Sequence, residues 1–173
     1  MTETVFKFPP SNVLSLTRFY GKPWELDSRE KLVLDRSWEA ANITRVRVPF
    51  ALFMEGARIL NISVHKRLVD SVKEVLNEIF SEFTNQEREV FGLDQYGGGY
   101  QFRPNEYKAE NLSLHAYGAA LDFSPILNPM GKAYKSADKM IPMKFINIFT
   151  KHGWKWGGSF KPIPECAHFE ATS

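Results

Sequence analysis

The feature that most constrains the fold is a change in hydrophobic period close to His65. Before it, the segment 44–53 (TRVRVPFALF) alternates apolar with other side chains, which predicts a half-buried strand that starts at Ile43 and ends near Pro49. A further β-like run over 58–64 predicts a second strand. After His65, apolar residues recur at three- and four-residue spacing, which predicts an amphipathic helix over about residues 66–83.

The remaining signals are shorter. Residues 1–37 are interpreted as an irregular arm with short elements, because Pro9-Pro10 and other turn residues interrupt it. The other expected elements are a turn over 96–100, a strand over 100–103, a turn and strand over 113–124, a helix over about 142–152 and a short strand over 167–169. Strands and helices mix without βαβ regularity, so we expect an α+β fold. The chain 1–173 is then a single domain with a small antiparallel sheet, flanking helices and the arm 1–37 packed on it.

Composition excludes several classes of protein. The chain has 173 residues and a net charge of +2, and its charges alternate in sign without the basic stripe that nucleic-acid binding needs. No apolar run approaches the length of a membrane span, so no membrane insertion is expected. The single cysteine, Cys166, excludes an internal disulfide and a multi-cysteine zinc site. The start, MTETVFKFPPS, lacks the apolar run of a signal peptide, so we expect cytoplasmic synthesis.

Two of the four histidines lie in short motifs suited to a metal ion. His115 precedes a Gly118 turn and a strand of small residues that contains Asp122, so the turn can fold the imidazole back toward the carboxylate. His168 follows in a second motif and supplies a third ligand. Three protein ligands leave one position open for water, which is typical of a catalytic zinc site. Either spacing alone is a weak signal, and both histidines are open to the simpler interpretation of buried structural residues.

Two further side chains complete this hypothesis. Glu165, three residues before His168, is placed to accept a proton from water and pass it to a leaving amine. Arg103 can hold a substrate carbonyl or carboxylate and stabilise an oxyanion, although an arginine at a strand end is more often a surface ion-pair residue.

Taken together, these motifs resemble the zinc D,D- and L,D-peptidases of bacterial cell walls. The family pattern Ser-x-His-x-x-Gly-x-Ala-x-Asp is matched at Ser113, His115, Gly118, Ala120 and Asp122. The closing acid-x-x-His-Phe is matched at Glu165, His168 and Phe169. The stretch 153–158 (GWKWGG) is similar to that of the branch of phage L-alanyl-D-glutamate endopeptidases, and Arg103 matches the upstream arginine.

The resemblance implies a hedgehog/DD-peptidase-like fold and a role for each residue. It makes His115, Asp122 and His168 zinc ligands, Glu165 the general base and Arg103 a substrate or oxyanion ligand. The candidates for substrate binding are Ser113, Tyr100 and Trp156, and Trp156 is equally well interpreted as a core anchor. The acid of the phage branch is often Asp, whereas Glu165 is the residue of the dipeptidase type, which leaves the cleaved bond open.

The expected function is zinc-dependent hydrolysis of a bond in the peptidoglycan stem peptide by a monomer that acts on the cell wall, in the manner of a phage lysis enzyme. The leading substrate bond is L-Ala–D-Glu. The alternatives are removal of terminal D-Ala by a D,D-carboxypeptidase or dipeptidase, and a non-catalytic wall-binding module. Cys166 is open to interpretation as a nucleophile paired with His168 or as a fourth zinc ligand; a small inert thiol is the favoured interpretation.

Overall fold

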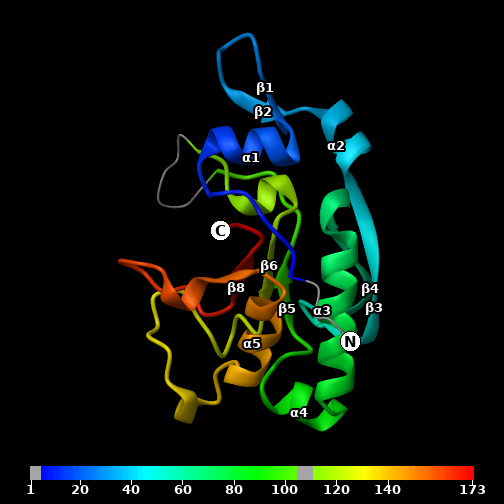
Figure 1. Ribbon diagram of the computed structural model, residues 1–173, viewed down its shortest axis with the longest axis vertical. Helices are drawn as coiled ribbons and strands as arrows, with labels where there is room; N and C mark the ends of the chain where they lie inside the picture. Colours follow the sequence, from blue (N-terminus) through cyan, green and yellow to red (C-terminus); the bar gives the residue numbers. More distant parts are fainter. Residues whose placement is uncertain (1–4, 105–110) are drawn as a thin grey trace.

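The computed structural model describes residues 5–104 and 111–173 and confirms the predicted α+β class, with small antiparallel sheets and helices packed beside them (Figure 1). The helices are α1 (Val13–Tyr20), α2 (Arg36–Asn42), α3 (Val69–Glu82), α4 (Asn85–Val90) and α5 (Met143–Lys151). The strands are β1 (Trp24–Leu26), β2 (Leu32–Leu34), β3 (Ile43–Met54), β4 (Ala57–His65), β5 (Tyr96–Gly98), β6 (Ala120–Phe123), β7 (Lys155–Trp156) and β8 (His168–Glu170).

The N-terminal half is built on the β3–β4 hairpin, one face of which packs on α3. Alternate residues of β3, from Val46 to Leu52, are buried, and they meet the apolar stripe of the helix. The predicted helix is confirmed, with residues 66–68 forming a tighter 3₁₀ turn before α3. The predicted end of the strand at Pro49 is wrong, because β3 continues to Met54. A proline removes one N–H from the ladder without ending the extended chain, and the pairing register shifts between Arg47 and Leu52.

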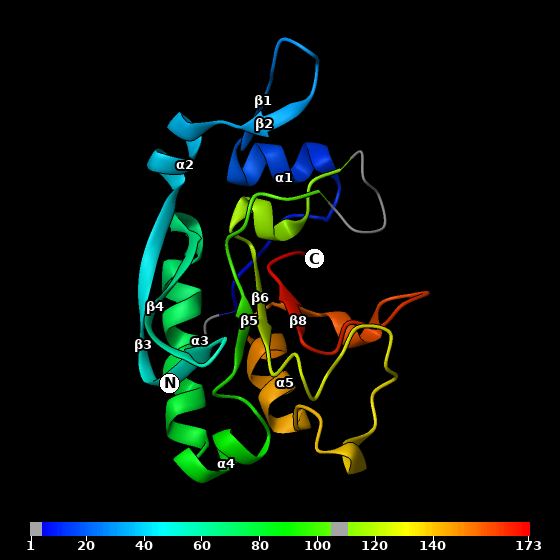
Figure 2. The ribbon, with the colours of Figure 1, turned by 180° about the vertical axis from the view of Figure 1, so that it is seen from behind.

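A four-stranded antiparallel sheet of order β5-β6-β8-β7 forms the other half, and α5 covers its apolar face (Figure 2). Phe169 of β8 stacks on Phe149 of α5 with ring centroids 4.0 Å apart. Phe145 of α5 packs edge-on against the ring of Phe169. These aromatic contacts hold the strand that carries His168 against the helix, so the opposite face of β8 is fixed in position.

The glycine-rich run lies differently from the prediction. The strand is Tyr96–Gly98, and residues 100–103 are irregular, with the Tyr100 N–H donating to the Ser63 carbonyl over 3.2 Å. A Cβ on Gly97 would come within 2.9 Å of the Asp122 Cβ. The glycine therefore allows β5 to lie close against β6. Residue propensity alone assigns the glycine-rich segment 96–100 to a turn, because it takes no account of the neighbouring strand.

The arm contains more regular structure than the sequence predicts: α1, the β1–β2 hairpin and the start of α2. Its residues 1–4 lie outside the described part of the chain, as does the beginning of the segment used in the signal-peptide interpretation. The Tyr20 hydroxyl donates to the Ala171 carbonyl over 2.7 Å, which ties α1 to the end of β8. The short helices α2 and α4 were not predicted, because each is shorter than two hydrophobic periods. Their side-chain caps, Asp35 and the Thr84–Glu87 capping box, are the only local signals.

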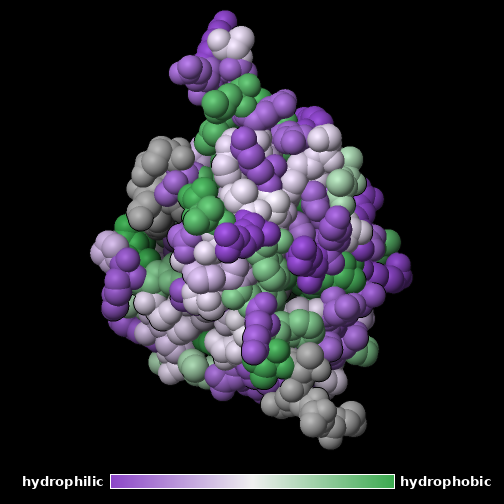
Figure 3. Space-filling model, turned by 45° about the horizontal axis from the view of Figure 1, so that its top comes forward, coloured by the Kyte–Doolittle hydropathy of each residue, from purple (hydrophilic) through white to green (hydrophobic). Residues whose placement is uncertain are grey.

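Within the described residues, none of the helices has the length and apolar character to cross a bilayer. Hydrophilic and hydrophobic residues are interspersed over the face drawn in Figure 3. The most exposed apolar side chains, Leu14 and Ile126, belong to separate segments of the chain. Isolated apolar residues of this kind are normal on a protein surface.

Candidate metal centre

A short turn that starts at Ser113 positions His115. Ser113 begins a 3₁₀ helix (Leu114–Tyr117), and its hydroxyl accepts the His115 N–H over 3.3 Å. Gly118 then adopts a left-handed conformation with φ of 66° and leads into β6. A Cβ at this position would lie 2.7 Å from the backbone nitrogen of His65. Only glycine therefore fits the turn that brings His115 back toward β6.

Strand pairing positions the other two side chains. Asp122 of β6 lies directly opposite His168 of β8 in the antiparallel register, so both side chains project from the same face of the sheet. The neighbouring pair on that face is Ala120 opposite Glu170. The two motifs, which are far apart in the sequence, meet because β6 and β8 are adjacent.

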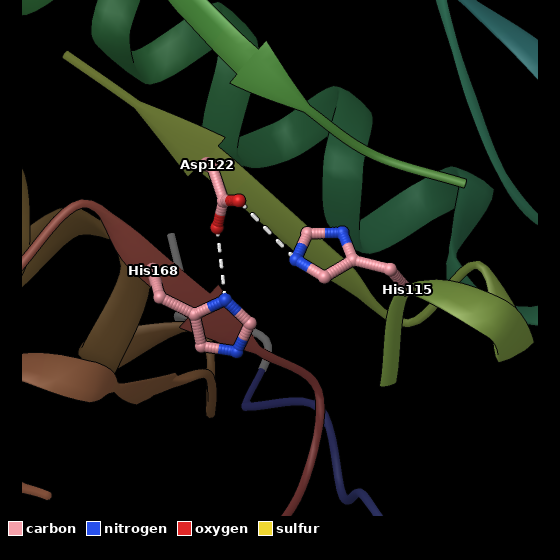
Figure 4. A group of neighbouring side chains, drawn as sticks. All are labelled: His115, Asp122 and His168. Atoms are coloured by element: carbon pink, nitrogen blue, oxygen red, sulfur yellow. Dashed lines mark hydrogen bonds and ion pairs between the residues drawn. The ribbon is translucent and has the colours of Figure 1, made fainter. Parts of the chain in front are cut away.

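The three predicted ligands converge in space (Figure 4). His168 Nδ1 lies 2.8 Å from Asp122 Oδ1, and His115 Nε2 lies 3.3 Å from Asp122 Oδ2. One ligand atom from each residue falls within 4.8 Å of the other two. Such a group of two imidazoles and one carboxylate can hold a metal ion, and its donor types suit zinc.

The hydrogen-bonding state of His115 supports this fit. Its Nδ1 lies 2.7 Å from the Gly99 carbonyl, which can only accept, so Nδ1 carries the proton and Nε2 presents a lone pair. Nε2 is buried and makes no hydrogen bond with the described residues, since its contact with Asp122 has the distance but not the geometry of one. A buried nitrogen with an unused lone pair beside a carboxylate is what a metal ligand requires.

The electrostatics of the group favour a cation. Burial alone would raise the pKa of Asp122, but its contacts with the His115 and His168 imidazoles outweigh it and hold that pKa well below its usual range. Burial alone would lower the pKa of His168, but hydrogen bonds to Asp122 and Glu170 outweigh it and raise the pKa to about 10. In this arrangement the proton of His168 supplies the positive charge that a metal ion would bring.

Glu165 lies beside this group. Its carbonyl accepts the His168 N–H over 3.0 Å, and its own N–H donates to the Gly157 carbonyl over 2.9 Å. A Cβ on Gly157 would approach the Glu165 carbonyl oxygen to 2.6 Å, which explains the glycine in the GWKWGG stretch. Glu165 also lines a pocket of about 550 Å³.

That pocket joins segments that are distant in the sequence. Its walls include Val13 and Leu16 of α1, Leu114, and the loop 160–163, with Lys155 and Glu170 on its polar side. The arm therefore contributes directly to the surface next to Glu165. The volume of the pocket falls within the range of about 300–1,000 Å³ that is common for ligand pockets.

Arg103 lies before and Ser113 lies after residues 105–110, which the structure does not describe, and the backbones of the two residues meet. The Arg103 carbonyl accepts the Ser113 N–H over 3.1 Å, and the Arg103 residue is half-buried. Ser113 is buried and caps the 3₁₀ helix, so its hydroxyl orients the start of that helix. Tyr100 is half-buried, and burial together with Glu39 of α2 raises the pKa of its hydroxyl.

The aromatic and sulfur side chains of the C-terminal segment separate into two groups. Trp154 is buried and donates to the Ser71 hydroxyl over 2.8 Å, which makes it a core residue. Trp156 is half-buried, donates to the Cys166 carbonyl over 2.9 Å and packs edge-on against Tyr134. Cys166 precedes β8 in a turn, so strand alternation does not apply to it, and its sulfur faces the Lys132 carbonyl. It is not in the group of possible ligands, and burial raises its thiol pKa.

The remaining two histidines have structural contacts. His65 is buried, with Nε2 2.9 Å from the Tyr20 carbonyl and Nδ1 accepting the Arg67 N–H. His152 Nε2 lies 3.0 Å from a Glu78 carboxylate oxygen. Both therefore act between elements of the fold and outside the group of His115, Asp122 and His168.

Sequence reasoning missed Glu170. Its side chain is buried, with Oε2 3.5 Å from His168 Nε2 and Oε1 accepting the Thr172 hydroxyl over 2.6 Å. The available signal was its place two residues after His168 in a strand, because such residues share a face. That signal becomes useful only once residues 168–170 are known to be extended.

Comparison with known families adds one finding. A family model described as D-alanyl-D-alanine carboxypeptidase matches residues 107–171, a segment that contains both motifs and begins within 105–110, outside the described residues. The match confirms the family resemblance predicted from the sequence, and it supports a peptidase of the carboxypeptidase or endopeptidase kind that acts on peptidoglycan. Comparisons with curated proteins and with solved structures give no match.

Proposed function

We propose that this chain, whose residues 107–171 are those of a D-alanyl-D-alanine carboxypeptidase family member, is a zinc-dependent endopeptidase that cuts the L-Ala–D-Glu bond of the peptidoglycan stem. The observation that carries the proposal is the convergence of His115, Asp122 and His168, with a buried, unused lone pair on His115 Nε2. The protein then acts on the cell wall as a monomer, in the manner of a lysis enzyme.

In this proposal, separate residues bind the metal ion, transfer the proton and hold the substrate. His115 Nε2, an Asp122 oxygen and His168 Nδ1 would hold the zinc ion, which when bound activates water and polarises the scissile carbonyl. Glu165 takes a proton from the attacking water and delivers it to the leaving amine. Arg103 holds a substrate carboxylate or the developing oxyanion through its guanidinium.

The pocket beside Glu165 supports an endopeptidase. At about 550 Å³ it offers far more room than a single terminal alanine needs, and its walls include Glu165 as well as Val13 and Leu16 of α1. A substrate that extends beyond the cleaved bond on both sides would use this space. Lys155 at its polar side suits the carboxylates of a stem peptide.

The second candidate function is removal of a terminal D-Ala by a D,D-carboxypeptidase or dipeptidase. Two observations favour it: the description of the matching family and the presence of Glu, where phage endopeptidases often have Asp, at position 165. The third candidate, a wall-binding module without catalysis, is opposed by the carboxylate of Glu165, which binding alone does not require.

The deciding experiment is digestion of purified peptidoglycan by the zinc-loaded protein, with and without a chelator, followed by mass spectrometry of the products. New amino termini on D-Glu, absent with the chelator, would support the endopeptidase. Release of D-Ala alone would transfer the assignment to the second candidate. No product after zinc is restored would contradict a hydrolase and leave the wall-binding module.

Glu165→Gln is the matched variant for this experiment. Because the change keeps the shape and removes the base, we expect turnover to fall by about 10²- to 10⁴-fold. Zinc content, measured by atomic emission on the same sample, should stay that of the unmodified protein, since Glu165 is outside the group of ligands. Full turnover by Glu165→Gln would remove this residue from the chemistry.

A further inference from the structure

In each histidine of the metal centre, the ring nitrogen that does not face Asp122 contacts an acceptor, and the two acceptors differ in kind. His115 Nδ1 faces the Gly99 backbone carbonyl at 2.7 Å. His168 Nε2 faces Glu170 Oε2 at 3.5 Å, while its Nδ1 faces Asp122. The two nitrogens of an imidazole point in diverging directions, so Glu170 contacts the side of His168 that is turned away from the centre.

Glu170 is itself fixed in place. Its Oε1 accepts the Thr172 hydroxyl over 2.6 Å, and the next carbonyl along the chain, that of Ala171, accepts the Tyr20 hydroxyl of α1. The residue directly opposite on β6 is Ala120, whose small side chain leaves room for the carboxylate. Only 7% of Glu170 is exposed, so solvent does not compete strongly for its oxygens.

A buried carboxylate needs a partner, and the fold offers His168 and Thr172. With the proton on Nε2, the nitrogen that faces Glu170, the lone pair of the neutral ring lies on Nδ1, which is 2.8 Å from Asp122 Oδ1. Carboxylates in this position orient metal-binding histidines and increase the basicity of the ligating nitrogen.

We propose that Glu170 is the positioning residue of the metal centre: it selects the His168 tautomer that ligates through Nδ1 and thereby sets the affinity for the metal. This inference rests on the proposed function only in taking His168 as a ligand. It assigns to Glu170 no contact with the substrate's reacting atoms and no proton transfer. Glu165 keeps the role of base, so the two glutamates that line the same pocket have separate tasks.

The experiment measures zinc affinity of the full chain by competition with a chromophoric chelator, without substrate. For Glu170→Ala we expect the Kd for zinc to rise by about 10- to 100-fold, the usual cost of losing such a partner. Glu170→Gln keeps an acceptor oxygen without the charge, so its Kd should lie between those of Glu170→Ala and the unmodified protein. Circular dichroism verifies that each variant is folded.

The chain offers a matched control in Glu78, which makes the same kind of contact with His152 at 3.0 Å, away from the centre. Glu78→Gln should leave the zinc Kd within about twofold of the unmodified protein, because His152 is outside the group of ligands. An equal loss of affinity in the Glu78 and Glu170 variants would indicate a general structural effect and overturn the proposal. An unchanged Kd in Glu170→Ala would also overturn it.

The result is separable from the proposed function. A protein that binds zinc in a Glu170-dependent manner but releases no peptide product would keep the positioning role and lose the peptidase. A protein that binds no zinc in its unmodified form would lose both.

Discussion

The two halves of the molecule use antiparallel strands in opposite ways. The β3–β4 hairpin with α3 has long strands, alternating burial and an apolar interior. The sheet β5-β6-β8-β7 has strands of two to four residues, and it buries His115, His168 and Glu170 next to the half-buried Asp122. The first region obtains its stability from apolar area, whereas the second maintains a polar cluster that apolar packing around it must support.

Two buried histidines show what this difference means in electrostatic terms. Desolvation lowers the pKa of His65 to about 4, and the nearby cations Arg67 and Lys66 lower it further. The carboxylates of Asp122 and Glu170 overcome a similar burial at His168 and raise its pKa to about 10. Burial alone therefore keeps an imidazole neutral, whereas neighbouring carboxylates stabilise a positive charge at the same depth.

The largest expected effect comes from removing the charge at the centre. Asp122→Asn keeps the side-chain shape but removes the anionic ligand, so zinc affinity should fall by more than the ~10- to 100-fold expected for outer contacts. Hydrolysis should be lost with it. Competition with a chelator measures the affinity, and native zinc binding by Asp122→Asn would remove this residue from the ligand set.

A smaller effect is expected in the apolar half. Leu76 of α3 is fully buried, and Leu76→Ala should lower the free energy of unfolding by about 2–5 kcal/mol. Urea denaturation measures this loss, and zinc affinity of the folded variant should remain unchanged because the helix contributes no ligand.

The control for the apolar half is Leu60→Ala, at an exposed position of β4, which should change the free energy of unfolding by less than about 0.5 kcal/mol. A loss at Leu60 equal to that at Leu76 would contradict the division into a packed and an exposed face of this region.

The smallest effect concerns His65 and depends on pH. Because its pKa is lower in the folded protein, the unfolded chain binds the proton first as the pH falls. The contribution of His65 is therefore complete above pH 6.5 and is lost as the pH falls through 4, by about 3 kcal/mol in total. His65→Gln should remove this part of the pH dependence in urea denaturation at pH 7 and pH 4.5. An unchanged slope would mean that His65 is not buried as a neutral ring.

Local patterns predicted the elements that follow one period over several turns. The helix after His65, the helix of residues 143–151 and the turn at Gly118 all depend on neighbours within a few positions. The strand at Tyr96–Gly98 was placed a few residues late, because glycine indicates a turn unless a neighbouring strand needs the space. The caps of α2 and α4 are visible in the sequence but too short to stand out among other polar residues.

For the candidate site, the sequence by itself determined which residues could take part, since the two short motifs that contain His115, Asp122 and His168 are specific in combination, whereas either alone is a weak signal. Their convergence depends on the pairing of β6 with β8, which joins positions 46 residues apart. The tertiary structure alone decided that the Gly99 carbonyl and Glu170 support the two histidines and that α1 borders the pocket near Glu165. The physical reason is that side-chain type and period are local properties of a chain, whereas register and burial arise only when distant segments pack together.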